Sequence, residues 1–188
     1  MGRISISETI DAPVDSVFAY VDDYRNTTKY MKDLVRWKPT TDVVHGKGAK
    51  FDSAMKAGPS TLNSTVDITT WTENRTIGWK SIAGFKQTGK WSFKAKGDDQ
   101  TEATFDMEYE FGGGIAGRML GRAAEPIVRA NLQTSVRNLK SQTEKLGSKA
   151  KAKPAAKSTT TAKRGTSAKR TSATQRTTAT KRSTATKR

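Results

Sequence analysis

The feature that most constrains the fold of this chain is an alternation of apolar and polar residues between positions 49 and 111. Turn-forming residues interrupt it, as at Gly58-Pro59 and Glu73-Asn74. Successive side chains of a β-strand point to opposite faces, so each alternating stretch predicts a strand with one apolar and one charged face. Short connections of this kind join antiparallel neighbours. The segment is therefore predicted to form an antiparallel meander.

The pairing of residues across the expected turns supports this prediction. Turns at 58–59 and 73–74 and a loop over 98–100 give the pairs Phe51–Val66, Lys50–Asp67, Ile68–Trp79, Thr70–Ile77, Trp91–Met107, Phe93–Phe105 and Lys96–Glu102. Apolar pairs and pairs of opposite charge are the ones that stabilise a sheet. Because a slip by one residue would move every partner to the wrong face, we expect the apolar face to be assigned correctly.

A long helix is predicted to follow the strands, over residues 112–146. It begins with three glycines, and Pro126 inside it should produce a kink. Its first half carries an apolar face with Leu120, Ala123 and Ile127 three or four residues apart. Two interpretations follow for this helix: a bent core helix, or a lid over a cavity between helix and sheet.

Polar residues on the expected inner face of the sheet favour the cavity. Ser53, Ser64 and Gln87 share that face with large aromatic residues, and such groups would need hydrogen-bond partners in a dry core. A mostly apolar wall with a few polar groups is typical of small-molecule sites. The predicted ligand contacts are Phe51, Met55, Val66, Ile68, Trp79, Trp91, Phe93, Phe105, Met107, Tyr109, Leu120, Ala123 and Ile127.

The order of the elements and several local motifs resemble a known superfamily. A strand over residues 3–10 precedes Ala-Pro-Val-Asp-Ser-Val-Phe-Ala-Tyr-Val-Asp-Asp at 12–23, a short helix with Tyr30-Met31, six strands, and Gly112–Gly114 with Glu125-Pro126 in the long helix. The pattern resembles the START-like (Bet v 1-like, SRPBCC) proteins, most closely the bacterial polyketide cyclase/dehydrase and lipid-transport group.

This resemblance implies a fold of the α+β class, known as the helix-grip fold. A curved seven-stranded antiparallel sheet would wrap around the long C-terminal helix, with two short helices after the first strand. The space between the sheet and the long helix would hold a hydrophobic ligand, such as a lipid or a polyketide-like molecule.

The residues offer little for catalysis. The chain has no cysteine, and its one histidine, His45, lies between two glycines in an expected exposed turn. No Ser-His-Asp set, metal-spaced cluster or phosphate-binding loop is present, so no catalytic residue, metal site or cofactor is predicted. Binding or carriage of a ligand is favoured. One alternative is a cyclase or dehydrase acting on an aromatic or polyketide substrate, and another is a nucleic-acid-associated protein.

The second alternative rests on the C-terminal segment, residues 148–188. Of the 34 Lys and Arg residues, 13 lie there without any acidic residue, which leaves 21 basic and 18 acidic residues, a net charge of +3, for the predicted domain 1–147. A segment without large apolar residues is predicted to be disordered, like the basic arms of histone-like proteins.

Spaced positive charge suits non-specific binding of DNA, RNA or an anionic membrane surface. The predicted polyanion contacts are Lys163, Arg164, Lys169, Arg170, Arg176, Lys181, Arg182, Lys187 and Arg188. The chain shows no signal-peptide pattern and no transmembrane run, so a cytoplasmic location is expected.

Overall fold

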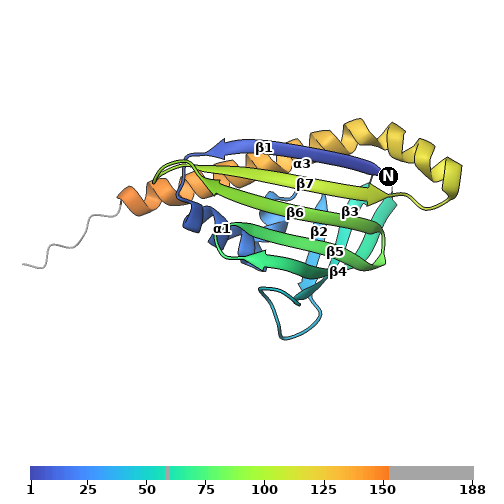
Figure 1. Cartoon of the computed structure of the whole chain (residues 1–188), viewed down its shortest axis with the longest axis horizontal. Helices are drawn as coiled ribbons and strands as arrows, with labels where there is room; N and C mark the ends of the chain where they lie inside the picture. The colour runs from blue at the N-terminus through green and yellow to red at the C-terminus, as the bar shows by residue number, and fades with distance from the viewer. Residues whose placement is uncertain (58–59, 153–188) are drawn as a thin grey trace, which may run out of the picture. The chain divides into compact units, whose positions relative to one another are not determined.

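The computed structural model describes residues 1–57 and 60–152, except for the side chains of 117–118, 120–121 and 149–152. Figure 1 shows the elements, which in chain order are β1 (Gly2–Ile10), α1 (Val14–Asp22), the 3₁₀ turn η1 (Tyr24–Asn26), α2 (Thr27–Tyr30), β2 (Leu34–Pro39), β3 (Lys50–Ala57), β4 (Ser60–Thr72), β5 (Thr76–Gly84), β6 (Lys86–Ala95), β7 (Thr101–Glu110) and α3 (Gly114–Ala152).

The strands form one curled antiparallel sheet, in the order β1-β7-β6-β5-β4-β3-β2. Strand β1 pairs with β7, and the other pairs join strands that are neighbours along the chain. The predicted α+β helix-grip fold, with its seven strands, short helices and long terminal helix, is confirmed. Helix α3 extends beyond residue 147, and the C-terminal segment from residue 153 onward lies outside the described residues.

The short helices follow from local sequence. Pro13 directly precedes α1, where a fixed φ and a missing N–H cost nothing, and the helix buries Val17, Phe18 and Val21. At the start of η1, the Asp23 carboxylate accepts hydrogen bonds from the backbone N–H and the guanidinium of Arg25. This pair lowers the pKa of Asp23, chiefly through the hydrogen bond from Arg25.

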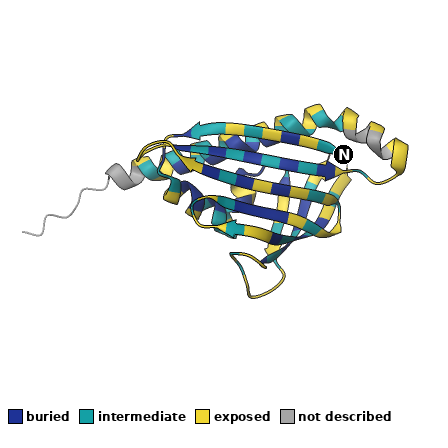
Figure 2. Ribbon diagram, viewed as in Figure 1, coloured by how far each residue is buried: buried dark blue, intermediate teal, exposed yellow. Residues whose placement is uncertain are grey.

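The predicted face of the sheet is confirmed, whereas the pairing is confirmed only in part. Phe51 lies opposite Val66, and Ile68 opposite Trp79. Figure 2 shows buried and exposed residues alternating along the strands, and Trp91 and Phe105 are each 1% exposed.

Three of the predicted pairings are wrong. In the β6–β7 hairpin, Trp91 pairs with Phe105 and Phe93 with Ala103, two residues away from the prediction, because the connection is longer than the three-residue loop assumed. A shift of two residues leaves each side chain on its expected face. Thr70 pairs with Gly78 instead of Ile77, because a bulge interrupts β4 between Ile68 and Thr70.

The two halves of α3 have different surroundings. Leu132, Val136 and Leu139 of the second half are at most 3% exposed, and this helix contacts β1, β7, α1 and α2. Hydrogen bonds fix it there: the Ser135 hydroxyl accepts from the backbone N–H of Lys32, and the Lys140 ammonium donates to the carbonyl of Thr9. The described side chains of residues 114–130 include none that is buried.

Candidate ligand-binding pocket

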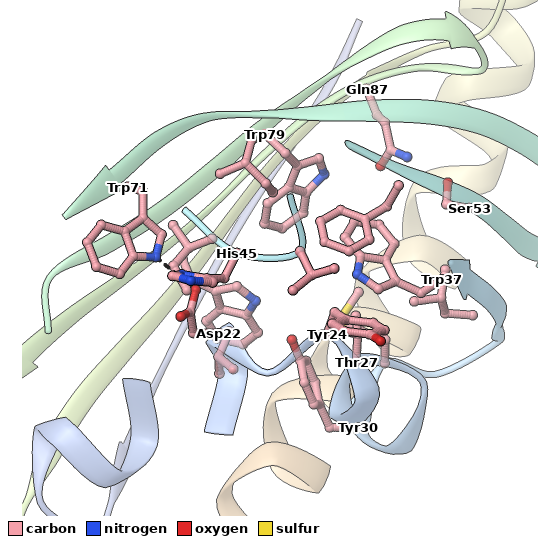
Figure 3. Close-up of a pocket in the computed structure, with 18 of the residues that line it drawn as sticks. Asp22, Tyr24, Thr27, Tyr30, Trp37, His45, Ser53, Trp71, Trp79 and Gln87 are labelled. Carbon is pink, nitrogen blue, oxygen red and sulfur yellow. Dashed lines mark hydrogen bonds between the residues drawn. The ribbon is translucent and has the colours of Figure 1, made fainter. Parts of the chain in front are cut away.

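A mostly apolar pocket lies between the concave face of the sheet and the segment that runs from the end of α1 through α2 (Figure 3). Its cavity volume is about 70 Å³, counted as space for the centres of water-sized spheres. Its walls come from α1 to β2, from the loop after β2 and from β3 to β6. The lining residues are Val21, Asp22, Tyr24, Thr27, Tyr30, Met31, Leu34, Trp37, Val44, His45, Gly46, Phe51, Ser53, Met55, Leu62, Ile68, Trp71, Ile77, Trp79, Phe85, Gln87 and Trp91.

Aromatic rings make up much of the pocket wall, which includes all four tryptophans of the chain. Trp37 stacks on Phe51 with ring centres 4.8 Å apart. Tyr30 meets Trp91 edge to face at 6.1 Å. Such ring pairs hold one another in place, so the wall presents fixed planar surfaces.

One end of the pocket carries neutral polar groups that bond to one another. The hydroxyls of Ser53 and Ser64 are 2.7 Å apart, and the amide nitrogen of Gln87 donates to the Ser64 hydroxyl at 3.0 Å. The prediction that these inner-face groups need partners is confirmed. A ligand reaching this end would meet a hydrogen-bonded amide and hydroxyls.

The other end carries an acidic group. The indole N–H of Trp71 donates to the Asp22 carboxylate at 2.8 Å, and Figure 3 shows His45 beside the two. The rings of His45 and Trp71 are 6.5 Å apart. His45 is exposed, as predicted, but its loop brings it to the pocket.

Tyr30 forms part of the pocket floor and is only 2% exposed. Burial raises the pKa of its phenol far above the ordinary value, and hydrogen bonds with Thr27 and Trp91 offset this only in part. The phenol therefore remains protonated at neutral pH and acts as a neutral group instead of a base.

The structure brings together some of the predicted ligand contacts. Phe51, Met55, Ile68, Trp79 and Trp91 line the pocket. Other predicted residues are buried in the core but are not lining residues; these are Val66, Phe93, Phe105, Met107 and Tyr109.

The residues of the long helix that were predicted to contact the ligand are not among the residues that line the pocket. Ala123 is exposed, Ile127 is 65% exposed, and the side chain of Leu120 lies outside the described part. The prediction that Ala123 and Ile127 face the sheet is wrong, because this half of α3 turns both outward and meets the core through the half-buried Val128 instead. The described residues of α3 contribute nothing to the pocket wall, so the cavity is not between sheet and long helix. The predicted polyanion contacts, from Lys163 to Arg188, lie outside the described residues.

Several lining residues were missed from the sequence. Trp71 was missed because the bulge in β4 reverses its expected orientation. Asp22 is the last residue of α1 and Tyr24 comes just after it, where the orientation of the chain is set by tertiary packing. Trp37 was missed although a large aromatic residue in a short alternating strand is a usable signal for the inner face.

The described residues also bear on metal sites and on membrane-spanning helices. No group of three or more His, Cys, Asp or Glu side chains among them could hold a metal ion. Within the same residues, no helix is long and apolar enough to cross a membrane.

Comparison with known proteins agrees with the fold. A family model described as "Polyketide cyclase / dehydrase and lipid transport" matches residues 1–144. No curated protein sequence matches the chain.

Solved structures with the same fold include a Thermus thermophilus protein (17% identity, TM-score 0.67, 77% of this chain and 99% of that one). A START superfamily protein from Mycobacterium smegmatis is 15% identical (TM-score 0.64, 77% and 98%). The Zhui aromatase/cyclase of a Streptomyces species is 14% identical (TM-score 0.61, 77% and 94%). With a family match over residues 1–144 and the helix-grip fold, this chain belongs to the polyketide cyclase/dehydrase and lipid transport family.

Proposed function

We propose that the protein binds a hydrophobic small molecule in the aromatic pocket between the sheet and the α1–α2 segment. The observation that carries this proposal is the convergence of all four tryptophans on one cavity. Apolar walls with a few placed polar groups are the usual form of such sites. The family to which the chain belongs supports the same function, because its description includes lipid transport.

The cavity volume restricts the ligand. A cavity of roughly 150 Å³ binds benzene, so a cavity of about 70 Å³ has to widen for a molecule of one ring. A lipid or a polyketide would require the half-buried Met55, Leu62 and Phe85 to move further apart. We therefore expect a small opening of this end for one-ring aromatic compounds and a wider opening for larger ligands.

Binding is favoured over catalysis by the chemistry of the wall. The titratable lining residues are Asp22, Tyr24, Tyr30 and His45. Tyr30 is held neutral, and Asp22 accepts from Trp71 at the edge of the pocket. The buried part of the wall therefore supplies rings and neutral hydrogen-bond groups, which orient a ligand without removing a proton.

A blocking variant tests the proposal. Leu62→Trp places a large ring at the half-buried end of the cavity, and Leu146→Trp makes the same change at a position that is 52% exposed on α3. We expect saturation-transfer NMR to detect benzyl alcohol bound to the wild-type protein and to L146W, but not to L62W. Circular dichroism establishes that both variants fold. Equal signals from all three proteins would overturn the proposal.

An enzymatic function is the second candidate, and the position of His45 beside Asp22 at the pocket edge favours it. A carboxylate beside an imidazole can move a proton to or from a bound substrate. The Zhui aromatase/cyclase shares the fold. Turnover of an aromatic or polyketide substrate that falls at least about a hundredfold in Asp22→Asn and His45→Gln would establish this function.

We also propose that the basic C-terminal segment binds polyanions such as DNA, RNA or an anionic membrane. Its 13 positive charges without an acidic residue support this. If about six charges engage, the logarithm of the affinity for DNA should fall with the logarithm of salt concentration at a slope of about −5. Equal DNA binding by the full chain and by a chain ending at Ala152 would contradict the proposal.

A further inference from the structure

The geometry points to a ligand class for the proposed pocket: an aromatic amine whose ammonium group pairs with Asp22. This inference rests on the proposed function, since it concerns the charge of the molecule that the same pocket binds. It concerns more than the hydrophobicity of the ligand. It predicts that the pocket prefers a cationic ligand to neutral and anionic ligands of the same size and shape.

The charge of the pocket wall is the first observation. Among the described lining residues, Asp22 is the one acidic residue, and none is Lys or Arg. A bound carboxylate would have no cation to pair with and would lie in the same cavity as Asp22. A bound ammonium would have a carboxylate within the same wall. Since an unpaired charge in an apolar site is costly, the wall selects against anions.

The position of Asp22 in α1 is the second observation. Asp22 is the last residue of the helix, where the helix dipole disfavours negative charge. The next residue, Asp23, has a partner: its two oxygens accept from the Arg25 guanidinium at 2.8 Å each. Among the side chains that the structure describes, Asp22 forms no ion pair.

The hydrogen bonding of Asp22 is the third observation. Oδ1 accepts from the neutral indole of Trp71, which fixes the direction of the carboxylate but leaves its charge uncompensated. No described residue donates a hydrogen bond to Oδ2. The carboxylate thus has an oriented second oxygen that can accept from a charged donor, the stronger kind of hydrogen bond.

An aromatic ring beside Asp22 completes the site. Trp71 lies next to Asp22 in the pocket wall, and ring faces attract cations through their quadrupole. The ring of a small aromatic amine would lie among the other tryptophans while its ammonium lies near Asp22. The site therefore offers separate surfaces for the two parts of such a ligand.

Three probes of equal size test the inference: benzylammonium, benzyl alcohol and benzoate. Quenching of tryptophan fluorescence reports binding to the full chain, because every tryptophan lines the pocket. Asp22→Asn removes the charge and keeps the shape. Asp15→Asn is the matched control, since Asp15 lies in the first turn of the same helix and is exposed.

We expect benzylammonium to bind about tenfold more tightly than benzyl alcohol, as a charge-assisted hydrogen bond would give, and benzoate to bind least. D22N should abolish the advantage of benzylammonium, and D15N should retain it. Binding of benzyl alcohol without any preference for benzylammonium would overturn the inference but leave the proposed function in place. Failure of all three probes to bind would overturn both.

Discussion

Trp71 of β4 donates its indole N–H to the carboxylate of Asp22 at the end of α1, at a distance of 2.8 Å. The contact depends on the bulge in β4, because unbroken alternation after Ile68 would turn Trp71 away from the pocket. Trp71 is also held by an edge-to-face contact with Phe18 of α1, with ring centres 5.6 Å apart. The bulge thus joins the sheet to α1 at the acidic end of the pocket.

Replacing Trp71 by Phe should measure how much the hydrogen bond from Trp71 to Asp22 contributes to stability. The variant keeps an aromatic ring but removes the donor to Asp22, so we expect the free energy of unfolding to fall by about 1–2 kcal/mol more than in Trp37→Phe. Trp37 is the matched control, because its contact with Phe51 is a ring stack. Urea denaturation of both variants provides the comparison, and equal losses would show that the hydrogen bond contributes nothing.

The fold could be predicted from the sequence because side-chain alternation is a local property. Phe51–Val66 and Ile68–Trp79 follow directly from turn position and alternation. The bulge before Trp71 could not be predicted from the sequence, since nothing in the local pattern shows that a residue will be left out of the pairing.

The location of the pocket was harder to predict for a similar reason. The apolar face of the helix predicts that Ile127 is buried, yet a local pattern does not show which partner is available to cover it. In the structure Ile127 is 65% exposed, and the pocket is covered by residues such as Tyr24 and Tyr30 instead. Trp79 and Trp91 were therefore predictable as part of the site, whereas Trp71 depended on the bulge and the residues from α1 to α2 depended on tertiary packing.

Gly89 lies directly opposite Trp79 in the sheet, and a Cβ atom at this glycine would overlap the indole ring. We expect Gly89→Ala to displace Trp79, to lower the free energy of unfolding by about 1–3 kcal/mol and to weaken probe binding. Gly147→Ala is the control: it has open space around its Cβ position and lies within α3, where alanine is the better helix former. Unchanged stability and binding in G89A would show that Trp79 does not need this close approach.

Tyr30 should make stability depend on alkaline pH. Its pKa in the folded protein is raised by burial, so the unfolded chain loses the proton first. Tyr30 therefore leaves the free energy of unfolding unchanged below pH about 10. Above that pH it lowers the free energy of unfolding by about 1.4 kcal/mol per pH unit. Urea denaturation of the wild-type protein and Tyr30→Phe between pH 8 and 11 should show a smaller alkaline loss in the variant. If the free energies of unfolding of the two proteins fell in parallel as the pH rises, a buried neutral Tyr30 would be excluded.

The two halves of α3 should differ in their effect on stability. Leu139 is completely buried, so Leu139→Ala is expected to cost about 2–5 kcal/mol. Ile127→Ala, at a position that is 65% exposed, should change stability by less than about 0.5 kcal/mol. Guanidinium denaturation measures both. A large loss for I127A would mean that Ile127 packs on the protein in solution.

The most direct test of the central claim is a crystal structure of the full chain with a bound aromatic probe such as benzylammonium. We expect the ring of the probe among Trp37, Trp71, Trp79 and Trp91, with its ammonium group on Asp22. A probe bound between α3 and the sheet, or found only on the outer surface, would contradict the proposed pocket.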